Sequence, residues 1–243
     1  MQNRNIVIFG ASGGIGSKCA EYLDGLGANL YLVAKNEDKL KRLQSKLNGN
    51  SQTIIADVRN SKDIKAVFSL FEQDKIRISG LVYSVGIEAV RPLRVMNREY
   101  ITDIMNVNCL AFAEICKYMC NKRFSEDGAS IVAISSLASL QNYTGELAYC
   151  VSKSALDSVV RSAAHEMVNR RIRVNSIQPG ATETAMIDKV RERIVDYDEN
   201  VFSVQPYGII DPKAIAYLVE FLLSDKAKYI SGACIPISAG RNI

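Results

Sequence analysis

Apolar residues in this chain gather in seven short runs, each followed by a longer stretch in which they recur at helical spacing. The runs span residues 5–10, 29–35, 52–58, 79–86, 129–136, 171–180 and 233–238. They are rich in β-branched residues, which is typical of strands. Because these strands are apolar on both faces and alternate with helical segments, the pattern predicts an α/β fold with a mainly parallel, seven-stranded sheet between two layers of helices.

The chain reads as one domain over residues 1–243. The helical segments are expected at 16–27, 37–48, 61–74, 99–124, 148–171 and 212–225. No repeat, low-complexity tract or linker interrupts the alternation, and this length suits one large core. The least regular stretch is about 181–210, after the sixth strand. Ligands bind outside the carboxyl ends of the strands in such sheets, so this stretch is expected to cover the substrate.

A glycine-rich turn, "GASGGIG" at 10–16, joins the first strand to the first helix. Gly10 would make the tight turn, Gly14 would let the backbone approach a pyrophosphate, and Gly16 would allow close helix packing. Ser12 and Ile15, within the same turn, complete this set of candidate cofactor contacts. The alternative is a purely structural turn. The strand-turn-helix context favours a dinucleotide and therefore a Rossmann-type, doubly wound sheet.

The end of the second strand bears on the choice of dinucleotide. Lys35 and Asn36 stand where an acidic residue would hydrogen-bond the ribose of NAD. We therefore expect NADP(H) to be preferred, with Lys35 pairing with the 2′-phosphate, Asn36 assisting, and NAD(H) as the alternative. Asn36 is also a suitable cap for the next helix, and that role is compatible with cofactor binding.

The segment 131–156 carries the candidate chemistry. Ser136 ends the fifth strand, and Tyr149 and Lys153 share one face of the following helix because they are four residues apart. A neighbouring ammonium lowers the pKa of a phenol, and a serine hydroxyl can stabilise a developing oxyanion. Ser135 and Ser139 compete with Ser136 for this role. The set predicts acid–base chemistry at a carbonyl.

These motifs together resemble the classical short-chain dehydrogenase/reductase family over essentially the whole chain. The resemblance rests on "GASGGIG", Asp57 in "ADV", "NVNCLAF", "ISSLAS", "YCVSK" and "NSIQPGATET", which occur in the family's order. It implies that Tyr149 is the acid/base and that Ser136 donates to the substrate oxygen. It also implies that Lys153 lowers the pKa of Tyr149 and binds the nicotinamide ribose, as Tyr149 also does, and that Asn108 helps to hold a water in the proton relay.

The resemblance also implies a set of cofactor contacts beyond the glycine turn. They are Asp57 and Val58 at the adenine, the retained Gly86, and Pro179, Gly180, Thr182 and Thr184 at the nicotinamide. Three departures stand out. Phe9 replaces the usual threonine, "YSVG" at 83–86 replaces Asn-Asn-Ala-Gly, and the C-terminus lacks the frequent Asp-Gly-Gly ending. The second departure predicts weaker backbone support on the cofactor side.

Composition and charge narrow the location and the partners. The net charge of +4 comes from 30 basic and 26 acidic residues without a long single-sign run, so neither nucleic acid nor a membrane is expected as a partner. No metal site is expected among the six cysteines, which suit reduced thiols in the cytoplasm. The polar start of the chain does not resemble a signal peptide.

The expected function is NADPH-dependent reduction of a carbonyl to a secondary alcohol, with a 3-oxoacyl compound as the first choice of substrate. The substrate is then a small molecule or is bound to an acyl carrier, which Lys122, Arg123, Arg170 and Arg171 would meet unless they are only solvated helix ends. Sugars, steroid-like compounds or small secondary alcohols are alternatives, and a non-catalytic dinucleotide-sensing regulator is another. The resemblance implies a homodimer or homotetramer formed through the helices at about 100–123 and 149–170.

Overall fold

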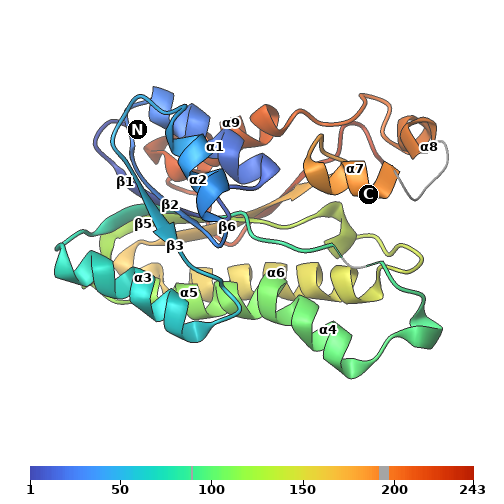
Figure 1. Ribbon diagram of the computed structural model, residues 1–243, viewed down its shortest axis with the longest axis horizontal. Coiled ribbons are helices and arrows are strands. Elements are labelled where there is room, and N and C mark those ends of the chain that lie inside the picture. The colour runs from blue at the N-terminus through green and yellow to red at the C-terminus, as the bar shows by residue number, and fades with distance from the viewer. Residues whose placement is uncertain (89, 192–196) are drawn as a thin grey trace.

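The computed structural model describes residues 1–88, 90–191 and 197–243 and contains one seven-stranded, fully parallel sheet (Figure 1). The strand order is β3-β2-β1-β4-β5-β6-β7. The strands are β1 (Asn5–Phe9), β2 (Asn29–Ala34), β3 (Ser51–Ile55), β4 (Ile78–Tyr83), β5 (Ser125–Ile134), β6 (Arg173–Pro179) and β7 (Cys234–Ile237). The predicted Rossmann-type fold and its seven strands are confirmed.

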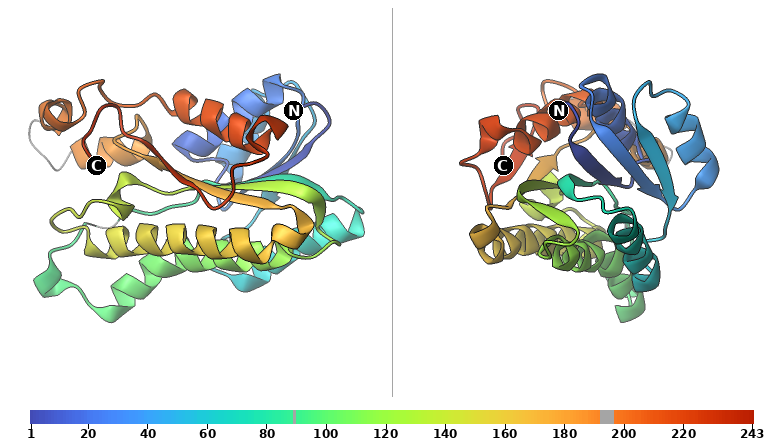
Figure 2. Two further views of the ribbon diagram at one scale, coloured as in Figure 1. Left: turned by 180° about the vertical axis from the view of Figure 1, so that it is seen from behind. Right: turned by 90° about the vertical axis from the view of Figure 1, so that its left-hand side faces the viewer.

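Helices cover both faces of this sheet (Figures 1 and 2). One layer contains α1 (Gly14–Gly25), α2 (Glu37–Gln44) and α9 (Pro212–Leu223), and the other contains α3 (Ser61–Gln73), α4 (Arg98–Met105), α5 (Ala111–Met119) and α6 (Leu147–Glu166). In β1, Ile6 and Ile8 pack toward the first layer while Val7 and Phe9 pack toward the second, and all four are completely buried. Each such side chain contributes roughly 1.5–3 kcal/mol through burial.

The helix expected over 99–124 is interrupted. A π-turn at Asn106–Leu110 separates α4 from α5, and the regular helix ends at Met119. Both halves bury apolar residues on the inner side of this layer: Ile104 of α4 packs with Ala148 of α6, and Phe112 and Ile115 of α5 pack in the core beneath the sheet. The apolar spacing therefore continues across the interruption. Hydrophobic periodicity therefore gives no sign of the one-residue insertion that a π-turn represents.

The stretch after β6 forms α7 (Ala185–Arg191) and α8 (Tyr197–Val204), and residues 192–196 of the expected covering segment lie outside the described residues. Gln205 links the two ends of this stretch. Its buried side-chain amide accepts from the Ala181 N–H at 3.0 Å and donates to the Gly208 carbonyl at 2.7 Å. The C-terminal segment returns to the loop before α6, where the Asn242 carbonyl accepts from the Gln141 amide at 2.5 Å.

Arg170 is not the free surface charge that the sequence suggested. Its side chain is only 13% exposed and donates to Asp127 Oδ1, the Met119 carbonyl, and the Ser125 hydroxyl and carbonyl at 2.7–3.1 Å. This guanidinium ties the end of α6 to the end of α5 and the start of β5. The planar fork makes several bonds at once, which an ammonium cannot do.

Replacing Arg170 therefore tests a structural role. We expect Arg170→Lys to lower the free energy of unfolding by roughly 1–3 kcal/mol, because buried carbonyls lose charge-assisted bonds. Arg171→Lys, at the exposed neighbouring position, is the matched control and should change it by less than about 0.5 kcal/mol. Urea unfolding measures both, and equal effects of the two substitutions would contradict this role.

Candidate active site

The glycine turn requires glycine for two different physical reasons. Gly10 has a φ of +81°, and a Cβ there would lie 2.7 Å from the Ser84 carbonyl carbon at the end of β4. A Cβ on Gly14 would lie 2.5 Å from Cγ2 of Thr184, which comes from the segment after β6. The turn is thus pressed between two strand ends, and Ile15 packs into the core behind it. No side chain caps α1 at Gly13, so its first N–H groups remain available to an anion.

A cleft at the carboxyl ends of β1, β2, β3 and β4 contains six of the expected cofactor contacts. These are Gly10, Ser12, Lys35, Asp57, Val58 and Gly86. The sequence reasoning missed Gly13, Val33, Ala34, Ala56, Arg59, Ser84, Val85, Ile87 and Val107, which also line it. The glycines, the apolar sides and the cations Lys35 and Arg59 suit a dinucleotide, so the residues present fit NAD(P)(H).

Asn36 acts as the helix cap that was the alternative interpretation. Its Oδ1 accepts from the Lys39 N–H at 2.9 Å at the start of α2, and it is not among the residues that line the cleft. Lys35 does line it and is exposed. In the same cleft, the Arg59 guanidinium lies 3.7 Å from the Asp57 carboxylate. The lining therefore includes one acidic group, Asp57, and two basic groups, Lys35 and Arg59.

Ser136, Tyr149 and Lys153 come together at the carboxyl end of β5. Ser136 follows the strand and begins a short 3-10 turn, Leu137–Ser139, while the other two lie in the first turns of α6. The Ser136 hydroxyl is hydrogen-bonded to the Tyr149 phenol. The Lys153 ammonium donates to the Ile134 carbonyl at 2.9 Å and lies 5.7 Å from the centroid of the Tyr149 ring.

Burial controls the charges of this pair. It raises the pKa of Tyr149 to about 12, where the Ser136 hydrogen bond lowers it and the Glu146 and Glu88 charges raise it further. Burial also lowers the pKa of Lys153 to about 8, against the attraction of Asp157. The expected lowering of the Tyr149 pKa by Lys153 stays a prediction; in this structure burial is the largest cause of the raised pKa, and the Lys153 ammonium donates to the Ile134 carbonyl. A protonated phenol suits an acid in the reducing direction.

Asn108 lies within the π-turn and is completely buried. Its Oδ1 accepts from the Ile87 N–H at 2.8 Å, and its Nδ2 donates to the Ile87 carbonyl at 3.1 Å and to the Ser152 hydroxyl at 2.9 Å. Ser152 in turn donates to the Tyr149 carbonyl at 2.7 Å. Through this one amide, the bonds join the Ile87 backbone at the cleft to α6, which carries Tyr149 and Lys153.

A second buried network, absent from the sequence reasoning, supports Ser136. Asp157 accepts from Ser176 at 2.7 Å and from Gln178 at 2.8 Å, and Gln178 also donates to the Ser139 hydroxyl. Ser139 then donates to the Ser136 carbonyl at 2.8 Å. Ser139, which was an alternative to Ser136 as the hydroxyl donor, thus holds the Ser136 backbone in place. Only the fold reveals this link, since its members come from β6, α6 and the 3-10 turn.

The expected nicotinamide segment leaves the end of β6. Within it, Pro179 ends the strand and Gly180 donates its N–H to the Ile237 carbonyl at 2.9 Å. The hydroxyl of Thr182 donates to the Gly180 carbonyl at 2.9 Å, which makes a local turn. Thr184 then meets Gly14, so this segment reaches the glycine turn.

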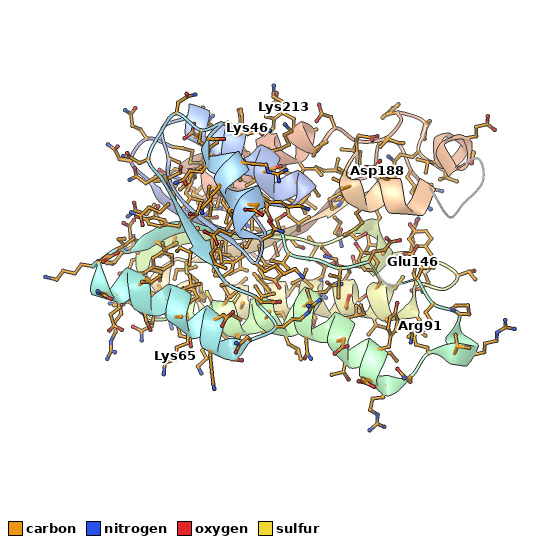
Figure 3. The ribbon with its side chains drawn as sticks, viewed as in Figure 1. Lys46, Lys65, Arg91, Glu146, Asp188 and Lys213 are labelled. Carbon is orange, nitrogen blue, oxygen red and sulfur yellow. The ribbon has the colours of Figure 1, made fainter. Side chains whose placement is uncertain are left out.

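The residues around Glu146, next to Tyr149 at the start of α6, are here called the mouth of the site; they carry charges of both signs and are partly apolar. Glu146 lies between α7 and the lower helix layer, near Arg91 (Figure 3). Burial and the nearby Glu88 raise the pKa of Glu146 to about 7, while Arg241 lowers it. Arg241 comes from the C-terminal segment and donates to Gln141 Oε1 at 2.8 Å, which also accepts from the Tyr143 hydroxyl. The exposed apolar residues Leu140 and Leu147 flank this group in the chain.

Glu146 should make stability depend on pH. Because its folded-state pKa is raised from 4.5 to about 7, its ionisation destabilises the fold. The cost is absent below about pH 4.5, grows between the two values and is complete above about pH 7. We expect Glu146→Gln to raise the free energy of unfolding by roughly 1–3 kcal/mol at pH 8 and by less than about 1 kcal/mol at pH 5.

Urea unfolding at the two pH values measures this difference. Glu126→Gln, at an exposed position on β5, is the control and should show no such dependence on pH. A gain for Glu146→Gln that is the same at pH 5 and pH 8 would contradict a raised pKa.

Comparison with known proteins places these features in one family. A family described as enoyl-(acyl carrier protein) reductase matches residues 10–242. The chain is 31% identical to the 3-oxoacyl-acyl-carrier-protein reductase FabG of Rickettsia typhi, over 96% of this chain and 95% of that protein. It is 28% identical to the human 3-oxoacyl-acyl-carrier-protein reductase, again over 96% and 95%.

Solved structures agree with this assignment. A protein from Brucella melitensis described as a short-chain dehydrogenase/reductase, glucose/ribitol dehydrogenase, superposes with a TM-score of 0.92 at 28% identity, covering 100% of this chain and 98% of that one. Levodione reductase shares the fold, with a TM-score of 0.91 at 23% identity and coverage of 99% and 98%. This chain therefore belongs to the short-chain dehydrogenase/reductase family and is an oxidoreductase that acts on CH–OH and C=O groups.

Proposed function

We propose that this enzyme reduces a carbonyl compound to a secondary alcohol with NADPH. The observation that carries the proposal is the convergence of Ser136, Tyr149, Lys153 and Asn108 beside a cleft suited to a dinucleotide. A protein that only senses a dinucleotide has no need of this set. The roles of the four residues rest on their contacts and on the family resemblance.

Bound NADPH would supply the hydride that reduces the carbonyl carbon. Ser136 would donate a hydrogen bond to the carbonyl oxygen as negative charge develops there. Tyr149 would give its phenolic proton to that oxygen, which makes the alcohol. Lys153 and Asn108 would belong to the path that resupplies the proton. The lowered pKa of Lys153 makes it easier for its ammonium group to give up a proton near neutral pH.

The preference for NADPH over NADH rests on charge. Lys35 and Arg59 line the same end of the cleft, near the expected site of the adenosine 2′-phosphate. The acidic Asp57 at this end is paired with Arg59, which reduces its repulsion of a phosphate. Lys35 therefore provides the positive charge that favours a phosphorylated ribose.

The proposed substrate class is a 3-oxoacyl thioester, the class named for the 3-oxoacyl reductases among its relatives. Of the four basic residues expected to meet an acyl carrier, Lys122 pairs with Asp127, Arg123 pairs with Glu72 and Arg170 is held within the fold, while Arg171 is exposed. A small thioester suits this surface as well as a carrier-bound one. Neutral sugars and other secondary alcohols are the second candidates.

We propose a homodimer or homotetramer that forms through the layer of α4, α5 and α6. Leu110, Leu147 and Val151 from this layer are 50%, 39% and 47% exposed, which is consistent with a further surface that covers them. The six cysteines are free thiols, which suits a cytoplasmic enzyme. Among the described helices, none combines the length and apolar character that crossing a membrane requires.

Removal of the Tyr149 hydroxyl tests the chemistry. We expect Tyr149→Phe to lower turnover by roughly 10²–10⁴-fold, the usual contribution of a general acid. Tyr143→Phe, at the mouth, is the control and should cost less than about fivefold. NADPH oxidation against a carbonyl panel that includes 3-oxoacyl thioesters measures turnover, and fluorescence titration checks that both variants still bind NADPH. If the wild type binds NADPH and reduces no carbonyl, the dinucleotide-sensing regulator replaces this proposal.

Removal of the Lys35 ammonium tests the cofactor preference. We expect Lys35→Ala to weaken NADPH binding by roughly tenfold and NADH binding by less than about twofold, because only NADPH carries the 2′-phosphate. Arg59→Ala should add to the loss of NADPH affinity. Lys39→Ala, on the neighbouring helix, is the control. Fluorescence titration at low and high salt measures the affinities, and the preference should shrink as salt rises. Equal losses for both dinucleotides would refute the assignment.

A further inference from the structure

Tyr83 is a buried polar residue that the proposed chemistry does not use. Tyr83 is the last residue of β4 and the first residue of the sequence "YSVG", at a position where the short-chain dehydrogenase/reductase family commonly has asparagine. Its side chain is completely buried, and its ring packs against Phe112 with the centroids 5.2 Å apart. Packing alone would be served equally well by phenylalanine, so the hydroxyl group needs its own explanation.

The π-turn provides that explanation. In a continuous α-helix, the Ala111 N–H would bond to the Val107 carbonyl four residues earlier. In this structure it bonds instead to the Asn106 carbonyl, five residues earlier. The Val107 carbonyl thus loses its α-helical partner in a buried part of the helix. The Tyr83 hydroxyl donates to this carbonyl at 2.5 Å, so the group freed by the π-turn is paired with a side chain from the sheet.

The π-turn also determines where Asn108 points. Adding one residue to a helical turn rotates the following residues by roughly 100° relative to the preceding ones. With the turn in place, the Asn108 amide reaches the Ile87 backbone and the Ser152 hydroxyl, and Ser152 reaches the Tyr149 carbonyl. Relaxation to a continuous α-helix would move Asn108 away from these partners. Any group that stabilises the π-turn therefore stabilises the placement of Asn108.

We infer that Tyr83 is a positioning residue for carbonyl reduction, because its hydroxyl stabilises the π-turn that directs Asn108 into the catalytic network. The inference rests on the proposed function. Tyr83 acts through Val107 and Asn108 and does not itself contact the reacting atoms. This role also accounts for the departure from the family's asparagine at this position.

The kinetic test is Tyr83→Phe, which keeps the ring and removes only the hydroxyl. We expect kcat to fall by roughly tenfold, with KM and NADPH affinity within about twofold of the wild type, because binding contacts remain. Tyr31→Phe is the matched control, since Tyr31, on β2, is also buried and packs edge-on against Phe71 of α3. It should leave kcat within about twofold. A kcat for Tyr83→Phe that equals the control would overturn the inference.

A double-mutant cycle separates positioning from general destabilisation. If Tyr83 acts through Asn108, adding Tyr83→Phe to Asn108→Ala should lower kcat by less than about twofold further. The full tenfold loss in that background would overturn the inference. Incorporation of 4-aminophenylalanine at Tyr83 restores a donor on the same ring and should recover most of kcat. This variant also serves if Tyr83→Phe does not fold.

Amide hydrogen exchange provides a readout that does not depend on turnover. In Tyr83→Phe, the amides of residues 108–112 should exchange roughly tenfold faster than in the wild type, while Tyr31→Phe leaves them unchanged. Unchanged exchange at 108–112 in Tyr83→Phe would overturn the inference. If the wild type reduces no carbonyl, the proposed function fails, and the exchange comparison still decides whether the Tyr83 hydroxyl holds the π-turn.

Discussion

The parallel sheet is covered by helices on both faces, and this burial constrains everything else in the molecule. Polar side chains can function only where the covering layers end, which is at the tips of the strands. The glycine turn, Lys35, Asp57 and Ser136 all follow the carboxyl end of a strand. The candidate site therefore lies where the helices leave the sheet uncovered, and its polar residues gather at the carboxyl ends of the strands.

The same burial creates the electrostatics of the site. Desolvation raises the pKa of Tyr149 and lowers that of Lys153, so each group is moved toward its neutral form. A neutral phenol beside a readily deprotonated ammonium suits delivery of a proton to a carbonyl oxygen. At the mouth, burial also favours the neutral form of Glu146 because it raises the pKa of that carboxyl group. Arg241, from the C-terminal segment, acts in the other direction and lowers this pKa.

Backbone irregularity has a function in this layer of helices. The π-turn replaces one regular hydrogen bond and aims Asn108 at the cofactor cleft. A regular helix would pair every interior carbonyl but would present a different side chain. The sheet compensates for the irregularity through Tyr83, which contacts the helix only because β4 and the π-turn pack together.

The seven strands and the parallel sheet could be predicted from the sequence alone, and so could the candidate catalytic residues, because these predictions depend on local periodicity and on motifs with fixed spacing. The sequence also offered Asn36 as a helix cap, which the structure shows. Only the tertiary structure decided that Arg170 is a structural residue, that Arg59 joins the cofactor cleft and that Tyr83 completes the π-turn. Each of these depends on contacts between residues far apart in the chain, whose partners no local pattern can specify.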